Sequence, residues 1–331
     1  MPNPDVTRRR MIAIVATAAG SAFLTGGRTA QAGDAVRWHG SALGAQVSIE
    51  IHHPDRADAL RLVDRCVLDI RRLEQQFSLY RDSDICALNS TGILVSPDAD
   101  MVALLEASLR FADLTDGAFD PTVQPLWQLY ADHFSSERPE PEGPSPQKLT
   151  ETMAKVGRSG LLVSADRVAL VKRGAAITLN GIAQGYATDR VVERLRGAGL
   201  SATLVNIGEI RAIGARPDGT PWRVGLADPD RPGVLTETVD LVDRAVATSA
   251  GAGFRFDSRG RFTHLLDPAT GRSPSLYRTV SVIAPTATEA DALSTAFSAM
   301  PLSRIERIVA ARPNLQARIV EAGGTLIVCG A

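Results

Sequence analysis

The chain has 331 residues, 44% of them hydrophobic, with 36 basic and 37 acidic residues and a formal net charge of −1. This balance gives no electrostatic attraction to nucleic acid or to an anionic membrane, so we expect neither as a partner. The three cysteines, Cys66, Cys86 and Cys329, are too few and too widely spaced for a disulfide framework or a zinc motif.

Residues 1–32 are predicted to be a signal peptide of the twin-arginine type. Arg8 and Arg9 precede an apolar run over residues 11–24, and the sequence AQA at 30–32 matches a cleavage site. The apolar run is about 14 residues long, shorter than the ~20 that cross a bilayer, which favours cleavage over a membrane anchor. We therefore expect the mature chain, residues 33–331, to lie in the periplasm without stable insertion in the membrane.

The mature chain is predicted to be one α+β catalytic unit. Apolar periodicity predicts helices over 54–77, 97–114, 183–197, 288–300 and 303–311. Strands are predicted at 36–38, 46–52, 161–163, 168–171, 175–179, 202–205, 222–226, 236–241, 245–248, 279–283 and 325–329. These elements do not alternate as βαβ units, so we expect mostly antiparallel sheet covered by helices. The proline-rich residues 135–147 are predicted to be a surface loop.

The first segment with possible chemistry, TDGAFDPT at 115–122, follows the second predicted helix. Gly117 can adopt the left-handed helix cap, and Asp120 is held extended by the proline that follows it. The alternative is an ordinary helix stop and turn, which the spacing taken alone favours.

The second segment, LNGIAQGYAT at 179–188, is predicted to run from a strand into a helix. Gly181 and Gly185 expose backbone where the helix begins, and the free N–H groups there suit a phosphate. The pattern is neither a Walker loop nor a dinucleotide-binding fingerprint, and close helix packing also requires glycine.

The third and fourth segments carry a histidine and a carboxylate. THLLDPATGR at 263–272 is predicted to end a strand in a tight turn, and His264 is a candidate acid or base or a structural histidine. In EADALSTA at 289–296, Asp291 and Thr295 share one helical face and form an oxygen pair suitable for Mg²⁺. The alternative is an N-terminal cap with an unrelated aspartate.

Taken together and in this order, the segments resemble the FAD:protein FMN transferases of the ApbE family. The resemblance extends over about residues 36–323 and is strongest at FSLYRDSD (77–84), GAFDPT (117–122), GIAQGYA (181–187), HLLDPATG (264–271) and ADALST (290–295). It implies an Mg²⁺-dependent enzyme that splits FAD, joins FMN to a Thr or Ser hydroxyl of a partner protein and releases AMP.

The resemblance also implies roles for single residues. The positions matching the family's FAD contacts are Leu43, Tyr80, Ala118, Phe119, Asp120, Thr178, Gln184 and Leu265. Those matching its metal site are the Gly181 carbonyl and the side chains of Asp291 and Thr295, with Ser294 beside them, and His264 or a nearby carboxylate is the expected base. Two positions depart from the family: Thr178 replaces an aspartate and Gln184 replaces a lysine, so Gln184 can donate only a neutral hydrogen bond.

The twin-arginine signal is similar to that of the NosX-like subgroup, whose members flavinylate a membrane-bound protein of nitrous oxide reductase maturation. The resemblance thus implies an acceptor flavoprotein, which we expect to be a membrane-bound electron-transfer protein. Two other functions stay open. One is an FAD pyrophosphatase in which water replaces the acceptor, and the other is a non-catalytic periplasmic flavin-binding protein, suggested by Thr178 and Gln184.

Overall fold

A large antiparallel sheet forms the centre of the protein. The computed structural model describes residues 35–231 and 233–330, so the predicted signal peptide lies outside the described residues. The sheet has eight strands, in the order β1 (Val36–Ala42), β2 (Ala45–Ile51), β6 (Thr203–Ile207), β7 (Ile210–Ile213), β10 (Ala245–Ser249), β11 (Tyr277–Ala284), β12 (Gln316–Glu321) and β13 (Leu326–Cys329). Every neighbouring pair is antiparallel, which agrees with the predicted α+β class.

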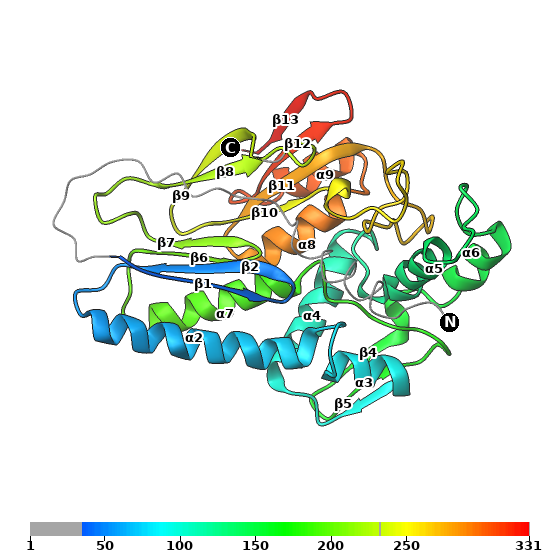
Figure 1. Ribbon diagram of the computed structural model, residues 1–331, viewed down its shortest axis with the longest axis horizontal. Helices are drawn as coiled ribbons and strands as arrows, with labels where there is room; N and C mark the ends of the chain where they lie inside the picture. The colour runs from blue at the N-terminus through cyan, green and yellow to red at the C-terminus, as the bar shows by residue number, and fades with distance from the viewer. Residues whose placement is uncertain (1–34, 232, 331) are drawn as a thin grey trace.

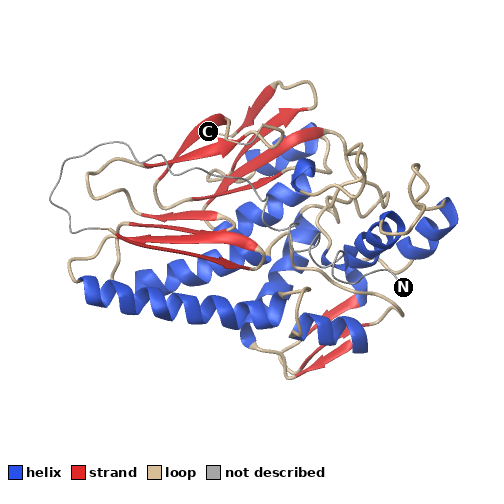
Figure 2. Cartoon of the chain, viewed as in Figure 1, coloured by secondary structure: helices blue, strands red, loops and turns tan. Residues whose placement is uncertain are grey.

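Helices cover one face of this sheet (Figures 1 and 2). They are α2 (Arg56–Phe77), α7 (Ala183–Gly197), α8 (Ala287–Phe297) and α9 (Leu302–Ala310). The apolar positions of α2 recur every three or four residues, so side chains such as Val63, Ile70 and Leu73 share one buried face. The same core cluster takes in residues of α7, α8 and α9, so one apolar layer fixes all four helices against the strands.

A hairpin covers part of the opposite face. Strands β8 (Trp222–Ala227) and β9 (Leu235–Leu241) form a two-stranded sheet. Their inward side chains, Trp222, Val224 and Leu241 among them, pack in a second core cluster with Leu204 and Ile283 of the main sheet. The main sheet is therefore buried on both sides in its middle.

Smaller elements surround one end of the sheet. They are α3 (Asp84–Thr91), α4 (Ala99–Leu114), α5 (Gln124–Phe134), α6 (Pro146–Met153), a sheet of β3 (Ile93–Val95), β5 (Arg167–Leu170) and β4 (Leu161–Val163), and the 3₁₀ turns η1 (Pro121–Val123), η2 (Arg158–Gly160) and η3 (Gly251–Gly253). The proline-rich segment lies on the surface between α5 and α6 (Figure 1). Its last residues begin α6, where Ser145 is the N-cap and Pro146 the first helical residue.

The predicted strand over 175–179 is wrong. The backbone of Ile177 bonds instead to the Asn89 side chain, which accepts from the Ile177 N–H at 2.7 Å and donates to its carbonyl at 2.9 Å. Thr178 donates its N–H to the Pro121 carbonyl at 2.8 Å. The segment is thus extended but pairs with a side chain and a turn rather than with a strand. Among the residues described, no helix is both long and apolar enough to cross a membrane.

Candidate active site

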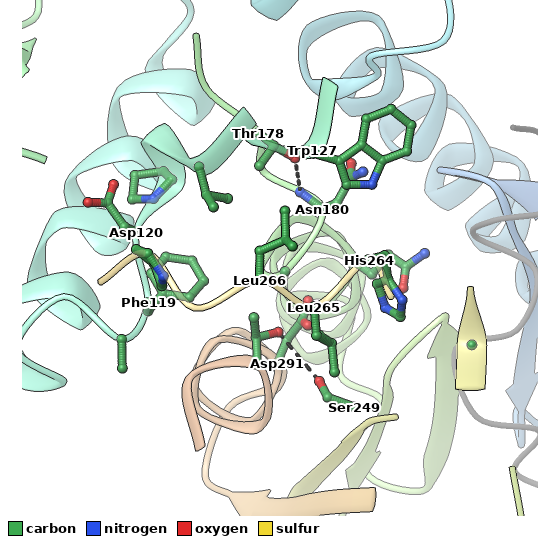
Figure 3. A pocket seen from close by; sticks show the side chains of 18 of the residues that line it. Phe119, Asp120, Trp127, Thr178, Asn180, Ser249, His264, Leu265, Leu266 and Asp291 are labelled. Atoms are coloured by element: carbon green, nitrogen blue, oxygen red, sulfur yellow. Dashed lines mark hydrogen bonds between the residues drawn. The ribbon is translucent and has the colours of Figure 1, made fainter. Parts of the chain in front are cut away.

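A pocket of about 150 Å³ opens where α7, α8, η1 and the end of β10 meet (Figure 3). The predicted site residues that line it are Ala118, Phe119, Asp120, Thr178, Gly181, Gln184, His264, Leu265, Asp291 and Thr295. The pocket also has lining residues that sequence reasoning missed, notably Trp127, Asn180, Glu209, Ser249 and Leu266. Segments more than 170 positions apart in the chain therefore build one site.

Asp291 is held at the pocket by a close crossing of α7 and α8. The backbone N–H of Gly185 donates to Asp291 Oδ2 at 2.9 Å. A Cβ atom at position 185 would overlap the Ala287 carbonyl and lie 2.8 Å from Asp291 Cβ, so this crossing requires glycine. Gly185 therefore serves packing and orients the carboxylate.

Gly181 and Thr295 meet on the same side of the pocket. A Cβ atom at position 181 would lie 2.9 Å from Thr295 Oγ1, so the loop before α7 runs directly against the hydroxyl. With Asp291 one helical turn before Thr295, the three expected metal-binding positions lie together.

A chain of hydroxyl groups lies behind Thr295. Ser294 Oγ donates to the Asp291 carbonyl at 3.0 Å. Ser249 Oγ lies 2.8 Å from Ser294 Oγ and 3.4 Å from Thr295 Oγ1. Because each hydroxyl has a single proton, Ser249 donates to Ser294 and Thr295 donates to Ser249, which leaves the Thr295 lone pairs available to a cation. Ser294 is buried and lies outside the pocket lining, so it supports the predicted ligands from behind.

Glu209, between β6 and β7, is a second buried carboxylate in the pocket. Burial, and then the charge of Asp291, raise the pKa of Glu209 well above its usual range, against a backbone hydrogen bond from Thr248. Burial also raises the pKa of Asp291 to about 7, against the hydrogen bond from Gly185. The signal for Glu209 in the sequence is a lone acid among apolar residues at 207–210.

The carboxyl groups of Asp291 and Glu209 both lie in the pocket, and whether a cation fits between them depends on their other partners. Neither Asp291 nor Glu209 forms an ion pair with any residue in the described ranges. Ionising both of these buried carboxyl groups in one cavity is costly unless a cation is present. Since the described residues hold no cluster of three His, Cys, Asp or Glu side chains, the donor set is carboxylate, hydroxyl and backbone carbonyl oxygen. Such a set fits a hard divalent cation such as Mg²⁺.

Asp189 fixes the start of the helix that carries Asp291. Its carboxylate accepts from the N–H groups of Ala287 and Thr288, both at 2.8 Å, and from Thr288 Oγ1 at 2.5 Å. Arg211 of β7 donates to the same carboxylate at 2.5 Å, and both side chains are 8% exposed. The beginning of α8 is therefore held by a buried ion pair as well as by the crossing at Gly185.

His264 lies on the loop opposite α8 (Figure 3). Its Nδ1 is 3.3 Å from the Phe254 carbonyl, which can only accept, so Nδ1 carries the proton and Nε2 keeps a lone pair. Burial lowers the pKa of His264, against the backbone hydrogen bond with Phe254, and so favours the neutral ring. With Leu265, Leu266 and Trp127 it forms an apolar wall across the pocket.

Asp120 shapes the wall on the other side. Its Oδ1 accepts from the Thr122 N–H at 2.8 Å and from Thr122 Oγ1 at 2.6 Å, and its Oδ2 accepts from the Arg158 N–H at 3.0 Å. These bonds occupy much of the carboxylate, which caps η1. Asp120 thereby holds Ala118 and Phe119 in the pocket wall.

Leu43 and Tyr80 do not line the main pocket. They line a small neighbouring cavity of about 20 Å³ that shares Asn180 and Gln184 with the pocket. Gln184 Nε2 donates to the Leu43 carbonyl at 3.2 Å, and Asn180 Nδ2 donates to the Tyr80 hydroxyl at 3.3 Å. The Gln184 amide thus links the two cavities, while Thr178 accepts from the Asn180 N–H at 3.2 Å.

This chain is similar to known proteins in both sequence and fold. Residues 43–319 match the model of the ApbE family. The FAD:protein FMN transferase of Vibrio cholerae is 30% identical over 255 residues, or 75% of each chain. The FAD:protein FMN transferase of Escherichia coli is 30% identical over 249 residues, or 71% of this chain and 70% of that protein. The crystal structure of the ApbE protein of Thermotoga maritima superposes with a TM-score of 0.78 at 31% identity, over 89% of this chain and 97% of the other.

The helix-covered antiparallel sheet, with its oxygen-lined pocket at the α7–α8 crossing, defines an α+β protein of the flavin-transferase class. This chain belongs to the ApbE family. The predicted fold and family are confirmed, and the names of the relatives support the expectation that the chain is an enzyme.

Proposed function

We propose that this chain transfers FMN from FAD to a Thr or Ser hydroxyl of a partner protein and releases AMP. The observation that carries the proposal is the convergence of Asp291, Thr295 and Gly181 at one side of a pocket. Apolar side chains such as Phe119 and Leu265 line the remainder, where the rings of a dinucleotide can pack.

The metal in this proposal is Mg²⁺. The residues that would hold it are Asp291, Thr295 through Oγ1 and Gly181 through its carbonyl, with the carboxyl group of Glu209 beside them in the pocket. A bound Mg²⁺ would neutralise charge on the pyrophosphate and ease the departure of AMP.

In the proposed reaction the acceptor hydroxyl oxygen bonds to the phosphorus of the FMN half. The bond from that phosphorus to the bridging oxygen breaks, and AMP leaves with the electron pair. The hydroxyl proton passes to a base, either Nε2 of His264 or an ionised pocket carboxylate. The Phe254 carbonyl holds the His264 tautomer in which Nε2 can accept it, and the apolar wall of Trp127 and Leu266 limits the entry of water.

The test incubates residues 33–331 with FAD, Mg²⁺ and a candidate acceptor, and measures the acceptor mass. We expect a gain of one FMN, which Asp291→Ala abolishes and Asp240→Ala, an exposed carboxylate on β9, leaves unchanged. AMP release without labelling of any acceptor would indicate a pyrophosphatase instead. FAD binding without turnover would indicate a non-catalytic flavin-binding protein.

We also propose export to the periplasm, on the support of the paired arginines and apolar run in residues 1–32. The acceptor would then be an exported flavoprotein, and the signal favours a membrane-bound electron-transfer protein such as the one in nitrous oxide reductase maturation. Fractionation of cells expressing the full chain, with Arg8→Lys and Arg9→Lys as the export-defective pair, tests the location. Labelling of that recombinant membrane protein with FMN tests the acceptor.

A further inference from the structure

A second, larger cavity of about 950 Å³ adjoins the candidate active site. We call it the aromatic groove, and its lining residues are Trp127, Ala131, Phe134, Ser135, Ser136, Pro139, Pro141 and those at 252–259 together with Arg261. It shares Trp127 and Gly253 with the pocket. Its walls are the proline-rich segment and the loop over 252–261, whose side chains take no part in the proposed phosphoryl transfer.

The two walls of the aromatic groove are tied together. Arg261 donates to the Pro141 carbonyl and forms an ion pair with Glu142 at 3.0 Å. On the α5 side, His133 Nε2 bonds to the Glu140 carbonyl at 2.8 Å. These contacts hold the proline-rich segment in place, so a ligand would meet a groove that is already formed and would lose little affinity to ordering it.

Aromatic rings form the part of the groove nearest the pocket. The Trp127 ring lies 5.5 Å from that of Phe256 and 6.4 Å from that of Phe254, and Phe254 and Phe256 lie 5.1 Å apart. All three side chains are half-buried, so each leaves some ring surface open. Rigid aromatic surface of this kind is typical of sites that bind extended polypeptide.

One cation of the groove is left without an acidic partner. Arg255, Arg259 and Arg261 are exposed there, beside the carboxylate of Asp257. Arg255 pairs with Asp230 at 2.7 Å, and Arg261 pairs with Glu142. Across the described ranges, Arg259 alone of these three arginines forms no ion pair, so it is the cation most available to a partner.

We propose that the aromatic groove binds an extended segment of the acceptor protein, with apolar side chains against the rings and an acidic side chain against Arg259. The inference rests on the proposed FMN transfer. A chain lying in the groove and passing Trp127 brings its next residues to the mouth of the pocket, where the acceptor hydroxyl must reach the phosphorus. The rival occupant is the AMP half of FAD, whose phosphate would also meet the arginines.

The experiment uses residues 33–331 and three fluorescent peptides that share a central Thr and aromatic residues but carry acidic, neutral or basic flanks. Fluorescence anisotropy measures peptide binding, mass spectrometry measures FMN transfer, and quenching of flavin fluorescence measures FAD binding. Arg259→Glu is compared with Arg110→Glu, an exposed arginine on α4 outside both cavities.

We expect the acidic peptide to bind most tightly, and Arg259→Glu to raise its Kd and its KM roughly tenfold and to invert the preference among the peptides. Arg110→Glu should change neither. The inference would be overturned if Arg259→Glu left the order of peptide affinities unchanged. It would also be overturned if that variant lost as much affinity for FAD as for the acidic peptide, because the groove would then bind the dinucleotide. Charge-ordered binding without any FMN transfer would count against the proposed function but not against the groove.

Discussion

The backbone N–H of Gly185 on α7 donates to Asp291 Oδ2 on α8 at 2.9 Å, and position 185 has no room for a side chain. The hydrogen bond and the close approach come from the same crossing, so the orientation of the metal-binding carboxylate depends on how near the two helices lie.

Replacing Gly185 by alanine should separate α7 from α8 and displace Asp291. We expect a loss of about 1–3 kcal/mol in the free energy of unfolding, because an added methyl group must be accommodated in a packed crossing. Mg²⁺ affinity should fall as well, which isothermal titration calorimetry measures. Gly197→Ala on the same helix is the matched control, since a Cβ there meets nothing within 4 Å, and it should be neutral or stabilising by about 0.5–1 kcal/mol. Equal behaviour of the two variants would contradict this role for the crossing.

Asp189→Ala should destabilise the protein strongly and weaken Mg²⁺ binding. The change leaves Arg211 buried without its partner and frees two N–H groups at the start of α8, and breaking such a pair costs roughly 3–5 kcal/mol. In urea denaturation, the double variant Asp189→Ala with Arg211→Met should recover part of the stability, while Mg²⁺ affinity stays low. Full recovery of that affinity in the double variant would show that Asp189 does not position α8.

Mg²⁺ binding should strengthen as pH rises. Because the pKa of Asp291 is raised to about 7 in the folded state, the folded metal-free protein binds more protons than the unfolded chain between about pH 4 and 7. Its stability therefore falls as pH rises through that range. A cation binds the ionised carboxylate, so its Kd should fall by about tenfold per pH unit for each proton displaced. Glu209→Gln removes one such proton, and calorimetry should then find a shallower slope; an unchanged slope would exclude Glu209 from the cation site.

His264→Ala should slow FMN transfer while FAD still binds. Loss of a positioned base typically lowers kcat by about 10²–10⁴-fold, and single-turnover measurements separate this step from binding. His39→Ala, an exposed histidine on β1, is the control and should leave the rate unchanged. If the rate of His264→Ala stays within a factor of about two of the original protein, a pocket carboxylate is the base.

The features that could be predicted from the sequence are those set by the spacing of neighbouring residues. The apolar repeat of α2 and the Asp291–Thr295 spacing on α8 depend on helical periodicity, which the chain shows without knowledge of its partners. Residues 175–179 also have the composition of a strand, but the bonds that satisfy Ile177 come from Asn89, 88 positions away. Glu209 was missed for the same reason, since its proximity to Asp291 arises only when β6 and β7 pack against α7, which crosses α8. Ser294 was predicted at the metal site because it is next to Thr295 in the sequence. In the structure its hydroxyl donates to the Asp291 carbonyl.

The double hydrogen bond between Asn89 and the Ile177 backbone helps to hold the segment that brings Thr178 and Asn180 into the pocket wall. Deamidation of Asn89 would replace its donor nitrogen with a carboxylate oxygen, which would then face the Ile177 carbonyl and repel it. The wall over 175–180 would loosen although every helix and strand stayed intact. Activity lost by this route would reflect a chemical change in one side chain rather than unfolding of the protein.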